Sequence, residues 1–165
     1  MKKIQGILLP LALVFGAIAV FETGARYGTT NMRALAIAKE LQLPLGIYLS
    51  GHTTMDDKTH AQLVTVIDNG IAAGAMHRQL WYLGKESKAQ LEKVLRFALS
   101  MRGDAAAKRF EAIANSEPLP EGVNLGKLDE IRRAIDTAQV ELIDNAPSLN
   151  EAQQVEQAND IKIDS

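Results

Sequence analysis

Three side chains at four-residue intervals offer the clearest chemistry in the sequence: His52, Asp56 and His60. On one continuous helix this spacing places two imidazoles and a carboxylate on the same face, where they are suitable ligands for a divalent metal. However, Thr54 followed by Asp57 is typical of a helix N-terminus, which leaves His52 in the preceding loop and gives Asp56 an ordinary role at the helix end. Because short His and Asp spacings are common by chance, we expect no metal site here.

Motifs for catalysis or cofactor binding are not recognisable in the sequence. Ser50-Gly51-His52 does not match the G-x-S-x-G nucleophile elbow, and neither G-x-x-x-x-G-K-[ST] nor G-x-G-x-x-G occurs. The chain has no cysteine, so it has neither a disulfide framework nor thiol chemistry. His77 stands four residues before Trp81, which is more typical of a packing pair than of a general base. We therefore expect no catalytic residue, no cofactor and no enzymatic activity.

The elements that must position these side chains begin with an uncharged run from Ile4 to Phe21, preceded by Lys2 and Lys3. As a helix, this run spans about 27 Å, close to the hydrocarbon thickness of a bilayer, about 30 Å. It favours an uncleaved single-pass anchor that contacts the inner membrane through Ile4 to Phe21, with the C-terminal domain on the periplasmic side. The alternative is a signal peptide cleaved after Ala19, because Ala17-Ile18-Ala19 matches an A-x-A cleavage site.

The remainder of the sequence is mildly acidic. When residues 1–21 are removed, Lys2 and Lys3 are lost from the 18 basic residues, and the remaining 16 stand against 20 acidic residues, a formal net charge of −4. This balance argues against nucleic acid as a partner, because phosphate binding needs a concentrated basic patch. Aromatic residues are few, and Trp81-Tyr82 is the only adjacent aromatic pair. Leucine, isoleucine, valine and alanine must therefore fill the core.

Apolar periodicity then predicts a succession of helices. The first follows Thr30 and ends at Leu43-Pro44. The apolar stretch 43–51 comes next, either as a buried connector or as a patch that faces a membrane or a partner. The following helix extends to about Leu83, with Asn69-Gly70 as a candidate break.

Two further helices carry the clearest apolar faces. One begins at a capping box on Ser87 and ends at Gly103, and its apolar face comprises Leu91, Val94, Leu95, Ala98 and Leu99. After a short helix that begins at Asp104, the last helix runs from about Leu125 to Asp144, with Asn124 as its N-cap. Its apolar stripe has 3-4-3-4 spacing and comprises Leu128, Ile131, Ile135, Ala138 and Leu142. Two heptads are too few for a stand-alone coiled coil, so we expect this stripe to pack inside its own domain.

These patterns predict an all-α fold, an irregular bundle of about four helices preceded by one N-terminal transmembrane or signal helix. The predicted divisions are an anchor or signal peptide, a juxtamembrane connector, the helical domain and a disordered polar tail, at 1–21, 22–30, 31–146 and 147–165. The favoured function is a membrane-anchored envelope protein that acts as a non-enzymatic adaptor or accessory subunit, with another protein as partner. The alternative is a secreted or periplasmic helical protein, released by signal peptidase, that binds a small ligand or a metal. A third hypothesis, an anchored hydrolase using His52 or His60, lacks a partner nucleophile.

Overall fold

The structure, a computed structural model, describes residues 2–51 and 55–145, with side chains from Gly16 onward. The described part is helical and contains no strand. Its elements, in chain order, are α1 (Lys2–Gly51), α2 (Asp57–Arg78), α3 (Lys85–Ala114), α4 (Leu125–Gln139) and a π-helical turn that continues α4, η1 (Val140–Asp144). The predicted all-α class with four main helices is confirmed.

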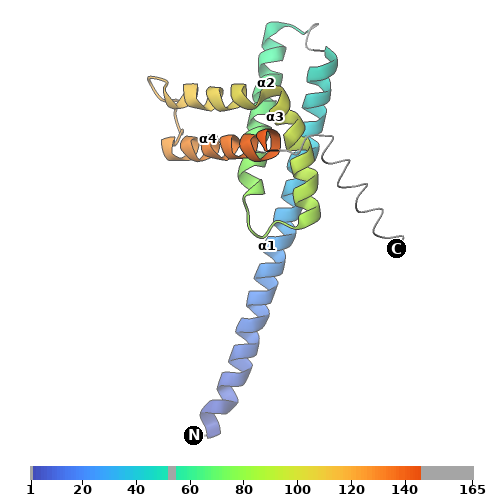
Figure 1. The fold of residues 1–165 in the computed structure, drawn as a ribbon. Coiled ribbons are helices and arrows are strands. Elements are labelled where there is room, and N and C mark those ends of the chain that lie inside the picture. The colour runs from blue at the N-terminus through green and yellow to red at the C-terminus, as the bar shows by residue number, and fades with distance from the viewer. Residues whose placement is uncertain (1, 52–54, 146–165) are drawn as a thin grey trace, which may run out of the picture.

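The first element, α1, is one unbroken helix whose N-terminal half projects from the bundle (Figure 1). It passes through residues 22–30, where the sequence predicts a connector, and through Pro44, where the sequence predicts a helix end. Glycine and proline lower helix propensity, but packing of an apolar face routinely outweighs propensity. Around Pro44 that packing is provided by residues buried against the bundle, namely Ala38, Leu41 and Leu45.

No helix in the part of the chain that the structure describes combines the length and the apolar character needed to cross a membrane. The described side chains of α1 begin at Gly16, and Glu22, Arg26 and Arg33 follow within the same helix. They therefore include no run of about 20 apolar residues. This finding contradicts the predicted single-pass location in the inner membrane with a periplasmic C-terminal domain, and the transmembrane helix predicted within residues 1–21 is not supported.

The C-terminal half of α1 packs against α2 and the first part of α3 (Figure 1). The core between them contains completely buried aliphatic side chains, including Ile67, Ile71, Leu91 and Leu95. Gly70 allows α2 to approach α1 closely, because a Cβ atom at this position would overlap the side chain of Leu41. The helix is continuous through Asn69-Gly70, so the candidate break predicted there does not occur.

The second half of α3 changes direction and lies beside α4 (Figure 1). The sequence predicts a helix end at Gly103, whereas α3 continues to Ala114. Gly103 instead lies against α4, and a Cβ atom there would overlap the end of the Gln139 side chain. The start of α4 is as predicted, since the Asn124 side-chain oxygen accepts a hydrogen bond from the backbone nitrogen of Lys127 at 3.1 Å.

The apolar stripe of α4 faces the bundle, which confirms the predicted packing inside the domain. Four of its members are buried, namely Leu128, Ile135, Ala138 and Leu142, and Ile131 is half-buried against the same core. The face predicted on α3 is likewise buried at Leu91, Leu95, Ala98 and Leu99. The predicted tail at 147–165 lies outside the described residues.

Two clusters of buried charge join the helices. Asp68 of α2 is completely buried and accepts hydrogen bonds from Arg102 of α3 at 2.8 and 3.1 Å. Arg78, buried at the end of α2, contacts Glu92 of α3 at 3.2 Å and Glu141 of η1 at 2.6 Å. Because buried charges need partners, these contacts fix α3 and η1 relative to α2. Arg78 is also the last residue of α2, directly before the turn that leads to α3.

Candidate functional site

The residues with metal-ligand spacing have structural roles where the structure describes them. Asp56 is the N-cap of α2, and its carboxylate accepts hydrogen bonds from the backbone nitrogen of Thr59 at 2.9 Å and from the Thr59 hydroxyl at 2.7 Å. These bonds, the backbone one most of all, lower the pKa of Asp56. The His60 ring lies 5.8 Å from the ring of Tyr48. His52 and Thr54 lie outside the described residues.

Within residues 55–145 and the described part of α1, no three His, Asp or Glu side chains are gathered as a metal site requires. Since His52 is not among them, the expected absence of a metal site stays a prediction. His77 reaches α1, where its Nε2 donates a hydrogen bond to the backbone carbonyl of Thr30 at 2.9 Å. The Ser50 hydroxyl donates to the carbonyl of Gly46 in its own helix at 2.8 Å. Both side chains thus have structural hydrogen bonds in this conformation.

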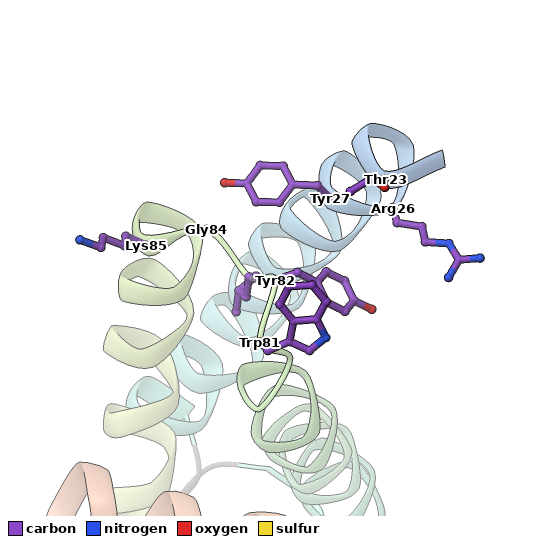
Figure 2. A pocket seen from close by; sticks show the side chains of 8 residues that line it. Thr23, Arg26, Tyr27, Trp81, Tyr82, Gly84 and Lys85 are labelled. Carbon is purple, nitrogen blue, oxygen red and sulfur yellow. The ribbon is translucent and has the colours of Figure 1, made fainter. Parts of the chain in front are cut away.

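A hollow of about 660 Å³ lies where α1 leaves the bundle, beside the turn between α2 and α3 (Figure 2). We call it the aromatic pocket. One side comes from a single stretch of α1 and the other from the turn, and the lining residues are Thr23, Arg26, Tyr27, Trp81, Tyr82, Leu83, Gly84 and Lys85. Its volume falls in the range of ligand and anchor-residue sites, which are mostly apolar with a few polar groups.

The rings of Trp81 and Tyr82 lie together at this pocket, and Tyr27 extends from α1 (Figure 2). Trp81 and Tyr82 form an edge-to-face pair, with ring centroids 5.2 Å apart and planes at 80°. Trp81 is 90% exposed and Tyr27 is 51% exposed. Exposed apolar surface costs about 25 cal/mol per Å² relative to burial, so covering the indole is strongly favourable. Each ring also carries a polar hydrogen that can be donated to a partner.

Hydrogen bonds to α1 fix the turn that carries Trp81. The Asn31 side-chain oxygen accepts a hydrogen bond from the backbone nitrogen of Gly84 at 2.9 Å, and the Asn31 amide donates to the carbonyl of Tyr27 at 2.7 Å. A Cβ atom at Gly84 would lie 2.5 Å from the Tyr27 hydroxyl oxygen and 2.9 Å from the Asn31 side-chain oxygen, so a larger residue would displace these two side chains. Gly84 is also the N-cap of α3, so the capping box predicted at Ser87 is not formed. The aromatic wall of the pocket is therefore held against α1.

The charged residues that line the pocket are both cations, Arg26 and Lys85, and no carboxylate or histidine lines it. Arg26 contacts Glu22 at 3.3 Å, but both side chains are well exposed, so this pair contributes little to stability and leaves the guanidinium available. An arrangement of rings and cations suits a group that combines an apolar body with negative charge. It lacks the paired acid and base or activated nucleophile that hydrolysis requires.

The sequence indicates only half of this pocket. Trp81-Tyr82 stands out as an aromatic pair, whereas Tyr27 falls in a segment that the sequence predicts to be a connector. Tyr27 and the Trp81-Tyr82 pair line one hollow because α1 stays helical through Tyr27 and α2 returns along it. No local spacing in the sequence reveals this arrangement. No known protein family, curated protein or solved structure matches the chain.

Proposed function

We propose that this protein is a non-enzymatic helical adaptor that binds a partner protein at the aromatic pocket. The observation that carries the proposal is the 90% exposure of Trp81 beside Tyr82, on a turn that hydrogen bonds hold in place. Tryptophan, tyrosine and arginine are the residues most enriched at the positions that dominate binding energy in protein interfaces. A fixed aromatic anchor also loses little side-chain entropy when a partner covers it.

Apolar surface extends from the pocket along the projecting part of α1. Val20 is 75% exposed and lies seven residues before Tyr27, which places the two on nearly the same face of α1. A further hollow on this helix shares Thr23 and Tyr27 with the aromatic pocket. Exposed apolar surface that adjoins a pocket favours an interaction site. It supports a partner that lies along α1 and inserts a side chain beside Trp81.

The chemistry of the pocket specifies the partner further. Its rings accept an aromatic or aliphatic side chain. Arg26 and Lys85 lie on opposite sides of the pocket (Figure 2), so they make its rim positive and favour a partner with acidic residues. Two cations on a chain of formal net charge −2 do not form the concentrated basic patch that nucleic acid requires, so the proposed partner is a protein.

A small anionic aromatic molecule is the second candidate ligand, because the volume of about 660 Å³ is also within the range of small-molecule sites. Small-molecule sites bury most of their ligand, and the 90% exposure of Trp81 favours a larger partner that covers the ring from outside.

Site-specific photo-crosslinking tests the proposal. A photoreactive amino acid is placed at Gln79, an exposed position beside Trp81, in the full-length chain in its source cells. The control carries it at Val66, which is 51% exposed and lines a different hollow. We expect one saturable adduct of protein size from position 79, absent from position 66 and lost on Trp81→Ser. Equal adducts from both positions, or an adduct that survives Trp81→Ser, contradicts the proposal. An adduct of small mass supports the second candidate.

A further inference from the structure

A second apolar hollow lies between the C-terminal half of α1 and the first part of α3, with a volume of about 530 Å³. We call it the α1–α3 groove. Its lining residues include Leu35, Lys39, Leu49, Lys93, Val94 and Phe97. It shares no lining residue with the aromatic pocket, so it is a separate surface of the same protein.

The groove is apolar but incompletely covered. Leu49 and Phe97 are 54% and 44% exposed, and Leu43 on the same part of α1 is 70% exposed. The sequence leaves 43–51 open as either a buried connector or a patch that faces a partner. In the structure Leu45 is buried in the core while Leu43 and Leu49 are exposed to solvent. Only one side of this helical segment therefore packs against the core.

The shape of the groove matches an α-helix. On α1 its lining runs from Leu35 to Leu49, which corresponds to about 21 Å at about 1.5 Å per residue, or roughly four turns. On α3 it runs from Gln90 to Phe97 with the spacing of one helix face. Two neighbouring helices with apolar side chains between them provide the ridges and grooves into which a third helix packs.

The charge of the groove selects among such helices. Both charged residues that line it are lysines, Lys39 and Lys93, and no carboxylate does. Glu40, the residue after Lys39, lines a different hollow with Ile37. The positive charge of the groove is therefore opposite in sign to the formal net charge of the chain, −2. A helix with carboxylates beside its apolar face would bring them against these lysines.

We infer that the α1–α3 groove binds an amphipathic helix of a partner protein whose apolar face is flanked by acidic residues. The occupant completes the packing of Leu49 and Phe97 and pairs its carboxylates with Lys39 and Lys93. This inference goes beyond the proposed adaptor contact at Trp81 and rests on different residues, so each can fail without the other.

Fluorescence anisotropy with the full-length chain tests the inference. The probe is a labelled synthetic peptide of four helical turns, with leucines at i, i+3, i+4 and i+7 and glutamates on both sides of that face. One control peptide replaces every glutamate with lysine, and another scrambles the order of the same residues. We expect the acidic amphipathic peptide to bind about tenfold or more tightly than either control, with an affinity that falls as salt rises.

Charge-reversal variants locate the site. Lys39→Glu with Lys93→Glu is expected to weaken binding of the acidic peptide by about tenfold or more, because both rim charges become repulsive. The matched control, Lys58→Glu with Lys127→Glu, changes the net charge equally at exposed positions outside the groove and should keep the affinity. Trp81→Ser should also keep the affinity for the acidic peptide, so this test is independent of the proposed binding at the aromatic pocket.

Two outcomes overturn the inference. One is equal binding of the acidic and basic peptides, or an equal loss of affinity in both double variants. The other is a dimer of the unliganded chain in analytical ultracentrifugation that Phe97→Ser converts to a monomer, because the groove would then be filled by a second copy. Phe97 is 44% exposed, so this substitution is not expected to unfold the protein.

Discussion

Arg102 of α3 donates two hydrogen bonds to the carboxylate of Asp68 of α2, from Nε at 2.8 Å and from Nη2 at 3.1 Å. Asp68 is completely buried, so the hydrogen bonds from Arg102 compensate its carboxylate for the loss of contact with water. The hydrogen bond to Asp68 also raises the pKa of Arg102. Arg109 supports the same place, with Nη1 at 4.0 Å from the carboxylate and 3.2 Å from the Asn69 side-chain oxygen. The crossing of α2 and α3 is thereby fixed by charge as well as by apolar packing.

Arg102→Met should lower the free energy of unfolding by about 3–5 kcal/mol, because it leaves a buried carboxylate without its closest partner. Urea denaturation measures this loss. Arg96→Met on the same helix, at an exposed position, should change stability by no more than about 0.5 kcal/mol. Adding Asp68→Asn to Arg102→Met should restore part of the loss, since it removes the unpaired charge. Equal stability of the two single variants would show that the pair is dispensable.

Gly70→Ala should destabilise the protein by about 1–3 kcal/mol, because the added methyl overlaps the buried side chain of Leu41 where α1 and α2 meet. Gly28→Ala is the matched control, since nothing lies within 4 Å of a Cβ atom there. That control should be neutral or raise stability by up to about 1 kcal/mol, because alanine favours helix over glycine. Thermal and urea unfolding compare the two, and the same sign of change in both would refute the close approach.

Ile135→Asp should unfold the domain, because its side chain is 1% exposed and burial of an unpaired charge costs several kcal/mol. Val140→Asp, next to the end of α4 and 46% exposed, should remain folded. Far-ultraviolet circular dichroism distinguishes the two. A folded Ile135→Asp protein would mean that the stripe of α4 does not belong to the core.

The Asp56 cap makes part of the stability depend on pH. Its pKa is lowered in the folded state, so its contribution is present at neutral pH and is lost as the pH falls through the folded pKa, below about pH 4. The melting temperature of wild type should therefore exceed that of Asp56→Ala at pH 7, and the difference should shrink towards zero in strong acid. Asp56→Asn, which keeps an acceptor without a titrating charge, should show little of this pH dependence. A difference that is constant with pH would argue against the cap.

Asn31→Leu should release the turn that carries Trp81 without unfolding the helices, because it removes the acceptor for the backbone nitrogen of Gly84. Trp81 is the only tryptophan, so the near-ultraviolet circular dichroism of its indole reports on this turn specifically. We expect that signal to weaken while the far-ultraviolet spectrum stays the same. Asn31→Asp keeps the acceptor and should preserve the signal. An unchanged indole signal in Asn31→Leu would show that the turn is held by other contacts.

The features predictable from sequence were those set by local periodicity and capping. Asn124 and the stripe from Leu128 to Leu142 lie where the sequence predicts them, because helical spacing and an N-cap act over a few residues. The buried face of α3 follows from the same signal. In contrast, the sequence predicts a helix end at Gly103 and α3 continues past it, because a glycine packed against a neighbouring helix and one that ends a helix look alike in sequence.

The course of α1 and both proposed surfaces depended on tertiary contacts. Pro44 was predicted to end a helix, but burial of the residues around it keeps α1 intact to Gly51. The aromatic pocket forms because Tyr27 and Trp81, from different helices and turns, line the same hollow. The α1–α3 groove likewise requires Leu49 of α1 and Phe97 of α3 to line one hollow. These arrangements follow from the packing of whole helices, so the spacing of residues within either segment does not predict them.

Because α1 is one continuous helix, it fixes the distance and the angle between the two proposed surfaces. Its backbone links the aromatic pocket, at Tyr27, with the α1–α3 groove, at Lys39, without a break. Along a regular helix these two positions are separated by about 18 Å of axial rise and about 120° of rotation. Molecules bound at the two surfaces are therefore held at a set distance and phase, and insertion of one residue between the surfaces would turn one against the other by about 100°.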